Sequence, residues 1–492
     1  MDQQTEVKEC ISDTVKFNGV DTTLTLTLAG KLQWQDGQRH RCLTVEKEVL
    51  GFSTVGSKLF VKTVVEMSEG VCCVGGGNVG PTRKTFVFEP LSEESLQLWS
   101  QKLGQYIDSL GRPKKLLIFV NPFGGRKSAS KIFLSDVKPL LDDANILYTM
   151  QETKHQLHAK EIANKMDLSM YDGIVCVSGD GILVEVVNGL LEREDWQSAI
   201  KMPLGVVPAG TGNGMSKSLL DLVGYPCTAL YAVLAVIRGH KRSLDVATIL
   251  QGKTRFYSVL MLAWGLVADI DIESEKYRWM GSARMDFYAL QRILHLRTYN
   301  GNVYFVPAPG FEAFGDKLTG QIVECAGGVC TRGPNQEETI NIQQHGYRQS
   351  NINLQNLNWR KIEGPFISVW LHNVPWGSED TMAAPDAKFA DGYLDLIIMK
   401  TCSKLPLLAL MTEMNNGNHV KSPHVLYLKV KAFILEPGSQ TADPSKEGII
   451  DSDGEVLARG KGTYKCDQKS LMTYGKLQIT VDQGLATLFT PI

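Results

Sequence analysis

The order of apolar and polar residues changes twice along the chain. Up to about residue 90, short segments alternate apolar and polar positions between glycine clusters, which is typical of strands with one buried face. These segments are 23–28, 59–65 and 84–88. Segment 92–107 then carries apolar residues at helical spacing. The pattern predicts a small antiparallel β-domain closed by one helix, over residues 1–110.

From residue 111 the pattern becomes strand, loop and helix, repeated four times. The expected strands are 116–120, 146–150, 173–177 and 203–207, and the expected helices are 130–141, 157–165, 183–192 and 215–222. Continuous apolar strands that alternate with helices predict a parallel sheet covered on both faces. Such sheets bind ligands at the carboxyl ends of their strands. We therefore expect an α/β nucleotide domain over residues 111–242.

Beyond residue 243 the expected strands are irregularly spaced. They are 246–250, 257–262, 303–306, 366–371, 393–399, 426–435 and 477–481. This spacing indicates an antiparallel, sandwich-like β-rich domain over residues 243–492. Its segment 310–364 is polar and rich in Gln and Asn, so we expect a surface insertion there. The predicted fold is α/β plus β, with the small β-domain in front.

Composition narrows the class of protein. A chain of 492 residues exceeds the size of one core, which agrees with several domains. The net charge of −2, from 51 basic and 53 acidic residues, lacks the basic excess of a general nucleic-acid binder. The ten cysteines show no paired spacing, which predicts reduced thiols in the cytoplasm. We find neither a signal peptide nor a spanning segment of ~20 apolar residues, so any contact with a membrane is expected from the side.

Glycine-rich turns follow the first, third and fourth strands of the expected parallel sheet. They read Asn121-Pro122-Phe123-Gly124-Gly125-Arg126, Ser178-Gly179-Asp180-Gly181 and Gly210-Thr211-Gly212-Asn213-Gly214. Glycine lets backbone N–H groups approach a phosphate, and a helix that starts just afterwards adds the positive end of its dipole. Three such turns at one edge predict a phosphate cradle. The absence of GxxxxGK[ST], and of GxGxxG after the first strand, disfavours P-loop enzymes and dinucleotide-dependent redox enzymes.

Asp180 follows an apolar strand and stands between two glycines, so its carboxylate is expected to project into the crevice. One interpretation of this residue is a helix N-cap. The other is the carboxylate that phosphoryl transfer needs, which orients the attacking hydroxyl and accepts its proton.

Several runs carry a resemblance to a known family. SGDGILVEVVNGLLER, VNPFGGRK and PLGVVPAGTGN resemble the catalytic domain of the diacylglycerol kinase superfamily. SVLMLAWGLVADIDIESEKYRWMGSARMDFYALQRI, MAAPDAKFADGYLDL and DSDGEVL resemble its sphingosine kinase branch. This resemblance covers roughly residues 116–309 and 365–457. It implies phosphorylation of the primary hydroxyl of sphingoid long-chain bases, with ATP and Mg²⁺, and a β-rich domain that binds the lipid.

The resemblance also implies roles for individual residues. Asp180 becomes the catalytic base, and Ser178, Gly179, Gly181 and Asp271 join it at the substrate. The residues implied to bind the nucleotide are Asn121, Pro122, Phe123, Thr153, Glu185, Gly210, Thr211, Gly212, Arg278, Arg284, Asp453, Gly454 and Glu455. The metal ligands stay unassigned.

A chemical argument supports Asp271 as the carboxylate that binds the lipid headgroup. A sphingoid base carries a protonated amine beside its hydroxyl, whereas ceramide and diacylglycerol carry no such charge, so a carboxylate would select by chemistry. If the segment after Ala268 is helical, Asp271, Glu275 and Arg278 fall on one face, as they also would in a solvated stripe of ion pairs.

Two positions depart from the family pattern. Met261 stands where many sphingosine kinases have Ser, which removes a possible hydrogen bond to the headgroup. Phe123 stands where Arg is frequent, although Arg126 and Lys127 lie close enough to substitute.

Alternatives remain at this stage. A kinase of the same superfamily acting on ceramide or diacylglycerol would suit a membrane-targeting β-domain, and this one resembles a pleckstrin-homology fold. A non-catalytic adaptor that kept the kinase fold is the third possibility. The apolar segment 228–237 precedes a basic run at 238–242, so it suits a lipid-accepting wall or a calmodulin target as well as a core helix. The expected partners are thus the sphingoid base, a membrane surface and calmodulin, without nucleic acid.

Overall fold

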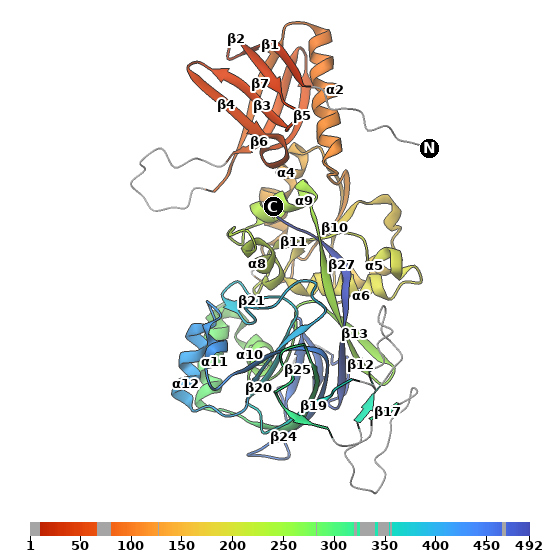
Figure 1. Ribbon diagram of the computed structural model, residues 1–492, viewed down its shortest axis with the longest axis vertical. Coiled ribbons are helices and arrows are strands. Elements are labelled where there is room, and N and C mark those ends of the chain that lie inside the picture. Colours follow the sequence, from red (N-terminus) through yellow and green to blue (C-terminus); the bar gives the residue numbers. More distant parts are fainter. Residues whose placement is uncertain are drawn as a thin grey trace.

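The computed structural model describes residues 10–65, 80–125, 127–281, 283–318, 322–324, 340–342, 354, 357–464 and 469–492, with only the backbone at 278, 322–324 and 340–342. Figure 1 shows an elongated molecule in which three parts follow one another along the long axis. The N-terminal sheet lies at one end, the parallel strands lie in the middle, and the β-rich part lies at the other end.

The N-terminal part is a seven-stranded antiparallel sheet with the strand order β4-β3-β2-β1-β7-β6-β5. Its elements are β1 (Ile11–Phe17), β2 (Val20–Leu26), β3 (Lys31–Asp36), β4 (Arg39–Thr44), α1 (Val45–Glu48), β5 (Val49–Val55), β6 (Lys58–Val65), β7 (Thr82–Pro90) and α2 (Glu93–Ser109). Helix α2 begins after Ser92, whose hydroxyl accepts a hydrogen bond from the N–H of Ser95 over 3.1 Å. Leu96, Trp99 and Leu103 pack into the core of this sheet. The predicted β-domain with its closing helix is confirmed, while its likeness to a pleckstrin-homology fold stays a prediction.

The middle part contains four parallel strands in the order β9-β8-β10-β11. They are β8 (Lys115–Val120), β9 (Leu147–Glu152), β10 (Gly173–Ser178) and β11 (Leu204–Pro208). The helical segments are α3 (Ala129–Ile132), η1 (Phe133–Val137), α4 (Lys138–Asp143), α5 (His158–Lys165), η2 (Leu168–Met170), α6 (Asp180–Leu191), α7 (Trp196–Ala199), α8 (Gly214–Asp221) and α9 (Ala229–Arg238). Every residue of β10 is buried, as expected for a central strand covered on both faces. The predicted α/β unit is therefore confirmed.

The β-rich part begins with β12 and holds most of the remaining strands. Its elements are β12 (Lys241–Gln251), β13 (Thr254–Ser258), β14 (Met261–Gly265), α10 (Leu266–Glu273), η3 (Ser274–Met280), α11 (Ala283–Leu294), β15 (Tyr299–Pro307), β16 (Asp316–Lys317), β17 (Ile322–Glu324), β18 (Ile340–Ile342), β19 (Arg360–Glu363), β20 (Ser368–His372), β21 (Trp376–Ser378), β22 (Thr381–Met382), β23 (Leu394–Met399), α12 (Lys404–Glu413), η5 (Asn418–Lys421), β24 (Leu426–Gln440), β25 (Ile449–Ser452), β26 (Glu455–Arg459) and β27 (Leu477–Phe489). Apart from the β17–β18 pair, its described strands pair with one another in antiparallel fashion, as predicted.

The last strand joins the middle and β-rich parts into one sheet. β27 pairs antiparallel with β12 and β24, and its end lies parallel to β11, with Leu488 opposite Leu204. The sheet therefore runs in the order β26-β25-β14-β20-β23-β24-β27-β11-β10-β8-β9. The strand predicted at 477–481 continues to Phe489, and this extension makes the connection. The domain boundaries near residues 110 and 242 remain our proposal.

The strand predicted at 257–262 is wrong. The strand is interrupted between β13 and β14, where Val259 and Leu260 form a bend. The N–H groups of Val259, Leu260 and Met261 bond to the carboxylate of Asp453, over 3.0, 2.8 and 2.7 Å. A side chain thus takes the donors that a neighbouring strand would otherwise use.

The segment after Ala268 is helical, but it is not one α-helix. α10 ends at Glu273, and the chain goes on as the 3₁₀ helix η3, in which Tyr277 has non-helical φ and ψ of −108° and 25°. The carboxyl groups of Asp271 and Glu275 lie close enough for the charge of Glu275 to raise the pKa of Asp271, whereas the place of the Arg278 side chain in this stripe stays a prediction.

Some of the predictions concern residues that the structure does not describe. Residues 1–9 and most of the insertion at 310–364 lie outside the described residues. Within the insertion, β16 and β19 pair with each other, and β19 pairs with β15.

The five cysteines in the described residues are free thiols. None of the described helices combines the length and the apolar character that crossing a bilayer requires.

Arg112 connects the N-terminal sheet to the middle part. Its guanidinium donates hydrogen bonds over 2.8–3.0 Å to four backbone carbonyls around α1, namely those of Val45, Glu46, Val49 and Leu50. Arg238, at the end of α9, donates to the carbonyl of Lys47 over 2.8 Å. The two arginines therefore hold α1 against the α/β part.

Replacing Arg112 with Ala should loosen this attachment. The variant loses four charge-assisted hydrogen bonds at once, and we expect a loss on the order of 3 kcal/mol, because such bonds contribute ~1.5–3 kcal/mol each and do not add fully. Calorimetry combined with limited proteolysis between α2 and β8 measures the effect. Arg39→Ala, an exposed arginine of the same sheet, is the matched control. Equal unfolding of both variants would contradict the prediction.

Candidate active site

The three glycine-rich loops meet at one edge of the parallel strands. A β-carbon on Gly125 would lie 2.8 Å from the carbonyl carbon of Gly210, and one on Gly179 would lie 3.2 Å from its Cα atom. Gly125 also has a φ of 52°, which other residues rarely adopt. Backbones this close leave no room for side chains, so the loops form one continuous surface of backbone. Its use as a phosphate cradle stays a prediction.

Asp180 is the first residue of α6, but its carboxylate faces the start of α8. One oxygen accepts a hydrogen bond from the N–H of Gly214 over 2.8 Å, and the other accepts from Met215 over 3.0 Å. Burial raises the pKa of Asp180, and these bonds oppose the rise. Each carboxylate oxygen can accept a second hydrogen bond, so acceptor capacity remains toward the cavity that Asp180 lines.

Asn213, to which the sequence analysis gave no role, holds the third glycine loop. Its φ of 58° is left-handed. Its side-chain oxygen accepts from the N–H of Gly210 over 2.9 Å, and its amide group donates to the Gly210 carbonyl and to Glu379 over 3.2 and 2.6 Å. Asn is one of the few residues that adopt this conformation readily, so an Asn inside a glycine run was the available signal.

The first loop and the end of β9 lie beside this edge. The Asn121 Oδ1 atom accepts a hydrogen bond from the N–H of Phe123 over 3.0 Å, and the Phe123 ring is 59% exposed. Pro122 between them is partly exposed. Thr153 is buried, and its N–H bonds to the Val120 carbonyl over 2.9 Å. Arg126 lies outside the described residues.

Glu185 is engaged in capping a helix. Its two oxygens accept from the N–H groups of Leu157 and Ala159 over 2.9 and 3.0 Å, at the start of α5. Burial raises its pKa. Its predicted place at the nucleotide stays a prediction, and the capping role is what the geometry adds.

The turn between β25 and β26 reaches back to α6. Asp453, with a left-handed φ of 55°, is buried there, and burial raises its pKa to about 6. Glu455 accepts from the side chain of Gln156 over 2.7 Å, and burial raises its pKa to about 7. A β-carbon on Gly181 would lie 3.8 Å from its Oε1 atom. The structure therefore brings the turn of the β-rich part to the start of α6.

Asp271 lies against a second carboxyl group, that of Asp451 in β25. Asp451 is fully buried, and burial together with the charge of Asp271 raises its pKa well above the usual range. Burial also raises the pKa of Asp271, while the charge of Arg284 opposes this. Two carboxyl groups this close favour a proton on the pair. The sequence analysis gave Asp451 no role, although it opens the run DSDGEVL that contains Asp453.

The structure describes the side chain of only one of the two arginines that were predicted to bind phosphate, Arg284. Arg284 on α11 forms an ion pair with Glu275 of η3 and is otherwise buried. Arg278 lies in η3, and its side chain lies outside the description.

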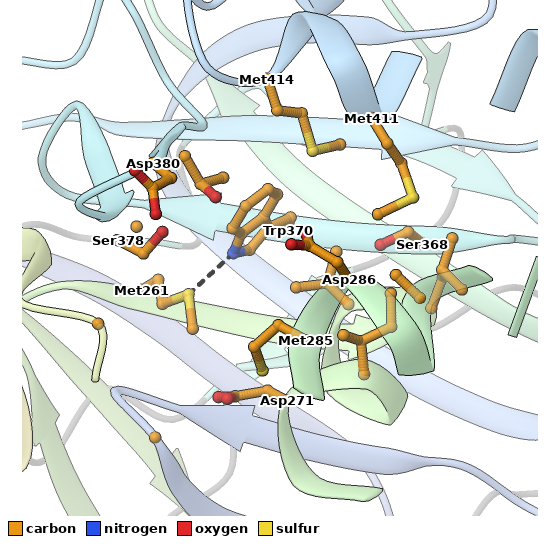
Figure 2. A pocket seen from close by; sticks show the side chains of 18 of the residues that line it. Met261, Asp271, Met285, Asp286, Ser368, Trp370, Ser378, Asp380, Met411 and Met414 are labelled. Atoms are coloured by element: carbon orange, nitrogen blue, oxygen red, sulfur yellow. Dashed lines mark hydrogen bonds between the residues drawn. The ribbon is translucent and has the colours of Figure 1, made fainter. Parts of the chain in front are cut away.

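A cavity of about 600 Å³ lies between the middle and β-rich parts. Its polar lining comes from Asp180, Gly181, Thr211 and Gly212 on one side and from Asp271, Arg284, Asp453 and Gly454 on the other. Its apolar lining includes Met285, Ile397, Met399, Leu407, Met411 and Met414. Figure 2 shows Asp271 on one side of the cavity and Met411 and Met414 on the opposite side, with Trp370 between them. The predicted apolar pocket around 259–267 contributes Leu260, Met261, Leu266 and Val267.

Comparison with known proteins agrees with this architecture. Residues 115–249 match the diacylglycerol kinase catalytic domain, and residues 351–473 match the YegS C-terminal NAD kinase beta sandwich-like domain. The chain is 62% identical to sphingosine kinase 1 of Arabidopsis thaliana, over 98% of this chain and 96% of that protein. It is 59% identical to sphingosine kinase 2 of the same plant, over 98% of each chain. A solved diacylglycerol kinase from Bacillus anthracis covers 77% of this chain and 97% of its own, at 18% identity and a TM-score of 0.46. Because the chain is about 60% identical to these relatives over nearly its full length, it belongs to the sphingosine kinase family.

Proposed function

We propose that this protein transfers the γ-phosphoryl group of ATP to the primary hydroxyl of a sphingoid base, with Asp180 as the general base. The observation that carries the proposal is that one cavity is lined by Asp180, by two of the glycine-rich loops, by Asp271 and by an extended apolar wall. Family membership supports both the reaction and the class of substrate.

The nucleotide would bind with its phosphates along the three glycine-rich loops. Backbone N–H groups there and the start of α6 supply donors and positive potential. Arg278 and Arg284 would add charge, and Asn121, Phe123 and Thr153 would lie beside the nucleotide.

Mg²⁺, when bound with ATP, neutralises phosphate charge, and it needs only one or two protein carboxylates. The carboxyl of Glu455 fits a cation, because the one hydrogen bond from Gln156 leaves acceptor capacity on its oxygens, and Asp453 beside it adds a second carboxyl group. Among the described residues, no cluster of three metal-binding side chains occurs, so phosphate oxygens and water would complete the shell.

Asp180 would take the proton of the attacking hydroxyl. The new bond forms between that oxygen and the γ-phosphorus, the bond from phosphorus to the bridging oxygen breaks, and ADP leaves with the electron pair. The N–H groups of Gly214 and Met215 fix the carboxylate in place before substrate arrives. Burial keeps it a stronger base than an exposed aspartate.

Asp271 would bind the protonated amine of the base. With one proton on the pair, Asp271 and its partner Asp451 offer one negative charge to the ammonium group. The alkyl chain would fill the methionine-rich part of the cavity, where each buried methylene contributes about 0.8 kcal/mol.

Asp180→Asn should abolish turnover while the protein stays folded. We expect a fall of about 10²–10⁴-fold in the transfer of labelled γ-phosphate, the range for loss of a general base. The amide offers one acceptor to the two N–H groups of α8, so the unfolding free energy should also fall by about 1–3 kcal/mol.

In the wild type, kcat should fall as the pH falls through the raised pKa of Asp180, because only the ionised carboxylate accepts a proton.

Asp172→Asn is the matched control. The Asp172 carboxylate also accepts two backbone N–H groups, from Lys114 and Lys115 over 2.7 and 2.9 Å, away from the cavity. It should lose stability and keep turnover. Substantial residual activity in Asp180→Asn would remove its role as base. Binding of ATP by the wild type without any product would favour a non-catalytic adaptor.

Asp271→Asn should lower kcat/KM for sphinganine by roughly tenfold to a hundredfold, because a charged hydrogen bond contributes about 1.5–3 kcal/mol. The measurement uses sphinganine, phytosphingosine, ceramide and diacylglycerol side by side. Asp286→Asn, another aspartate that lines the cavity from α11, is the control. If the wild type prefers ceramide or diacylglycerol, the runner-up substrate class is right and the role of Asp271 is wrong.

We also propose that α11 and α12 lie against a membrane. One face of α11 lines the cavity through Met285 and Ala289, while Phe287, Leu290 and Leu294 are about half exposed on another face. Leu405 at the start of α12 is 79% exposed, and Lys404 beside it donates to the Leu294 carbonyl over 2.7 Å. Trp279, before α11, is 82% exposed. An exposed apolar surface on a wall of a lipid cavity gives a bilayer-resident substrate a short path inward.

The double variant Phe287→Ser and Leu290→Ser should bind phosphatidylcholine vesicles at least tenfold more weakly, because it removes two large apolar side chains from the surface. Its activity on bases dissolved in detergent should change little. Leu134→Ser is the control, because Leu134 is a leucine of the middle part that is more exposed than either replaced residue, at 62%. Unchanged vesicle binding in a sedimentation assay would contradict this orientation.

The calmodulin prediction has less structural support. Residues Ala232–Arg238 of α9 are buried against the parallel strands, so calmodulin would have to extract this helix from the core. We therefore expect the segment to be a core helix.

A further inference from the structure

The cavity contains two hydrogen-bonding side chains that the proposed function leaves unused. Ser368 and Trp370 lie two residues apart on β20, so they face the same side, and both line the cavity. The Ser368 Oγ atom is buried and has no hydrogen-bond partner among the described residues. The Trp370 side chain is 5% exposed, and its indole N–H donates to the Met261 Sδ atom over 3.0 Å (Figure 2).

These groups are poorly satisfied for their surroundings. A thioether sulfur is a weak acceptor, and a buried donor or hydroxyl without a good partner costs free energy. Nearly all buried polar groups in proteins do have partners, so exceptions in a binding cavity point to the ligand. A hydroxyl group on the lipid would satisfy the indole N–H better than sulfur does.

The position of Met261 indicates which end of the bound lipid would lie beside the indole N–H. Its backbone N–H bonds to the Asp453 carboxylate over 2.7 Å, and Asp453 lines the same cavity beside the glycine-rich loops. The indole N–H therefore lies toward the reacting end of the substrate, away from Met411 and Met414. Because β14 and β20 are neighbouring strands, the Met261 sulfur and the Trp370 indole are held side by side at this end of the cavity.

We infer that Trp370 is a specificity-determining residue whose indole N–H donates a hydrogen bond to a hydroxyl of the sphingoid base, on carbon 3 or carbon 4, next to the amine-bearing carbon. The inference rests on the proposed function, because it concerns the same substrate in the same cavity. When the hydroxyl binds, the indole N–H gives up its hydrogen bond to the Met261 sulfur and donates to the hydroxyl oxygen instead. Bases that carry the hydroxyl are then favoured over bases that lack it.

Trp370→Phe tests this, because phenylalanine keeps an apolar ring and removes only the donor and part of the volume. Three bases are compared with the full-length enzyme and Mg·ATP: 2-aminooctadecan-1-ol, sphinganine with a hydroxyl on carbon 3, and phytosphingosine with hydroxyls on carbons 3 and 4. We expect kcat/KM to fall about tenfold, the effect of one neutral hydrogen bond, for each base that carries the hydroxyl in question. A loss that begins with sphinganine assigns carbon 3, and a loss confined to phytosphingosine assigns carbon 4.

Two variants serve as controls. Trp359→Phe removes a buried indole N–H that donates to the Leu354 carbonyl over 2.9 Å in a separate cluster, and it should leave the ratios among the three bases unchanged. Met261→Leu keeps the side-chain volume and removes the sulfur, so the preference for hydroxylated bases should persist. Its disappearance would mean that the indole serves Met261 and not the base.

The outcomes separate this inference from the function on which it rests. If the wild type phosphorylates none of the three bases, the proposed function fails and this inference fails with it. If the wild type phosphorylates them and Trp370→Phe lowers kcat/KM equally for all three, or for none, only the role of Trp370 is wrong.

Discussion

The active site depends on the backbone pairing of one strand, β27. Backbone groups in a buried sheet must find partners, and β27 supplies them to β12 along one side and, along the other side, to β24 and at its end to β11. The middle and β-rich parts therefore cannot separate without breaking the sheet. As a result, the glycine-rich edge and the turn at Asp453 stay opposite each other across one cavity. Domains joined only by a linker would move relative to each other by default.

This arrangement concentrates acidic groups where the two parts meet. Asp180, Asp271, Asp451, Asp453 and Glu455 are all held there, and burial raises the pKa of each. Backbone N–H groups satisfy two of these carboxylates, Gln156 holds Glu455, and Asp271 and Asp451 lie against each other. The remaining shortage of positive charge suits the cations of the proposed reaction, an ammonium group and the metal ion that accompanies ATP. Perturbed carboxyls of this kind cluster at functional sites for that reason.

Asp180 has a structural role that suits the catalytic role proposed for it. At the level of sequence the alternatives were an N-cap for the helix from Ile182 onward and a general base, but that helix, α6, has Gly179 at its N-cap. In the structure its carboxylate caps α8, which begins 34 residues further along the chain, at Gly214. Capping fixes the orientation of the oxygens, and a fixed, partly desolvated carboxylate is what a general base requires. The two roles therefore support each other.

The sequence by itself determined the alternation of strands and helices in the parallel unit, the antiparallel character of the two β-rich parts and the resemblance to the family. Apolar periodicity is local, and the carboxyl ends of parallel strands share an edge, so the three glycine loops could be brought together without a structure. Only the tertiary structure decided the break at Val259, the pairing of β27 with β11, the contact of Asp451 with Asp271 and the position of Trp370 beside Met261. The partners in these contacts are far apart in the chain, 194 residues for Val259 and Asp453 and 109 for Trp370 and Met261. Local propensity carries no information about such partners, because packing across the whole sheet selects them.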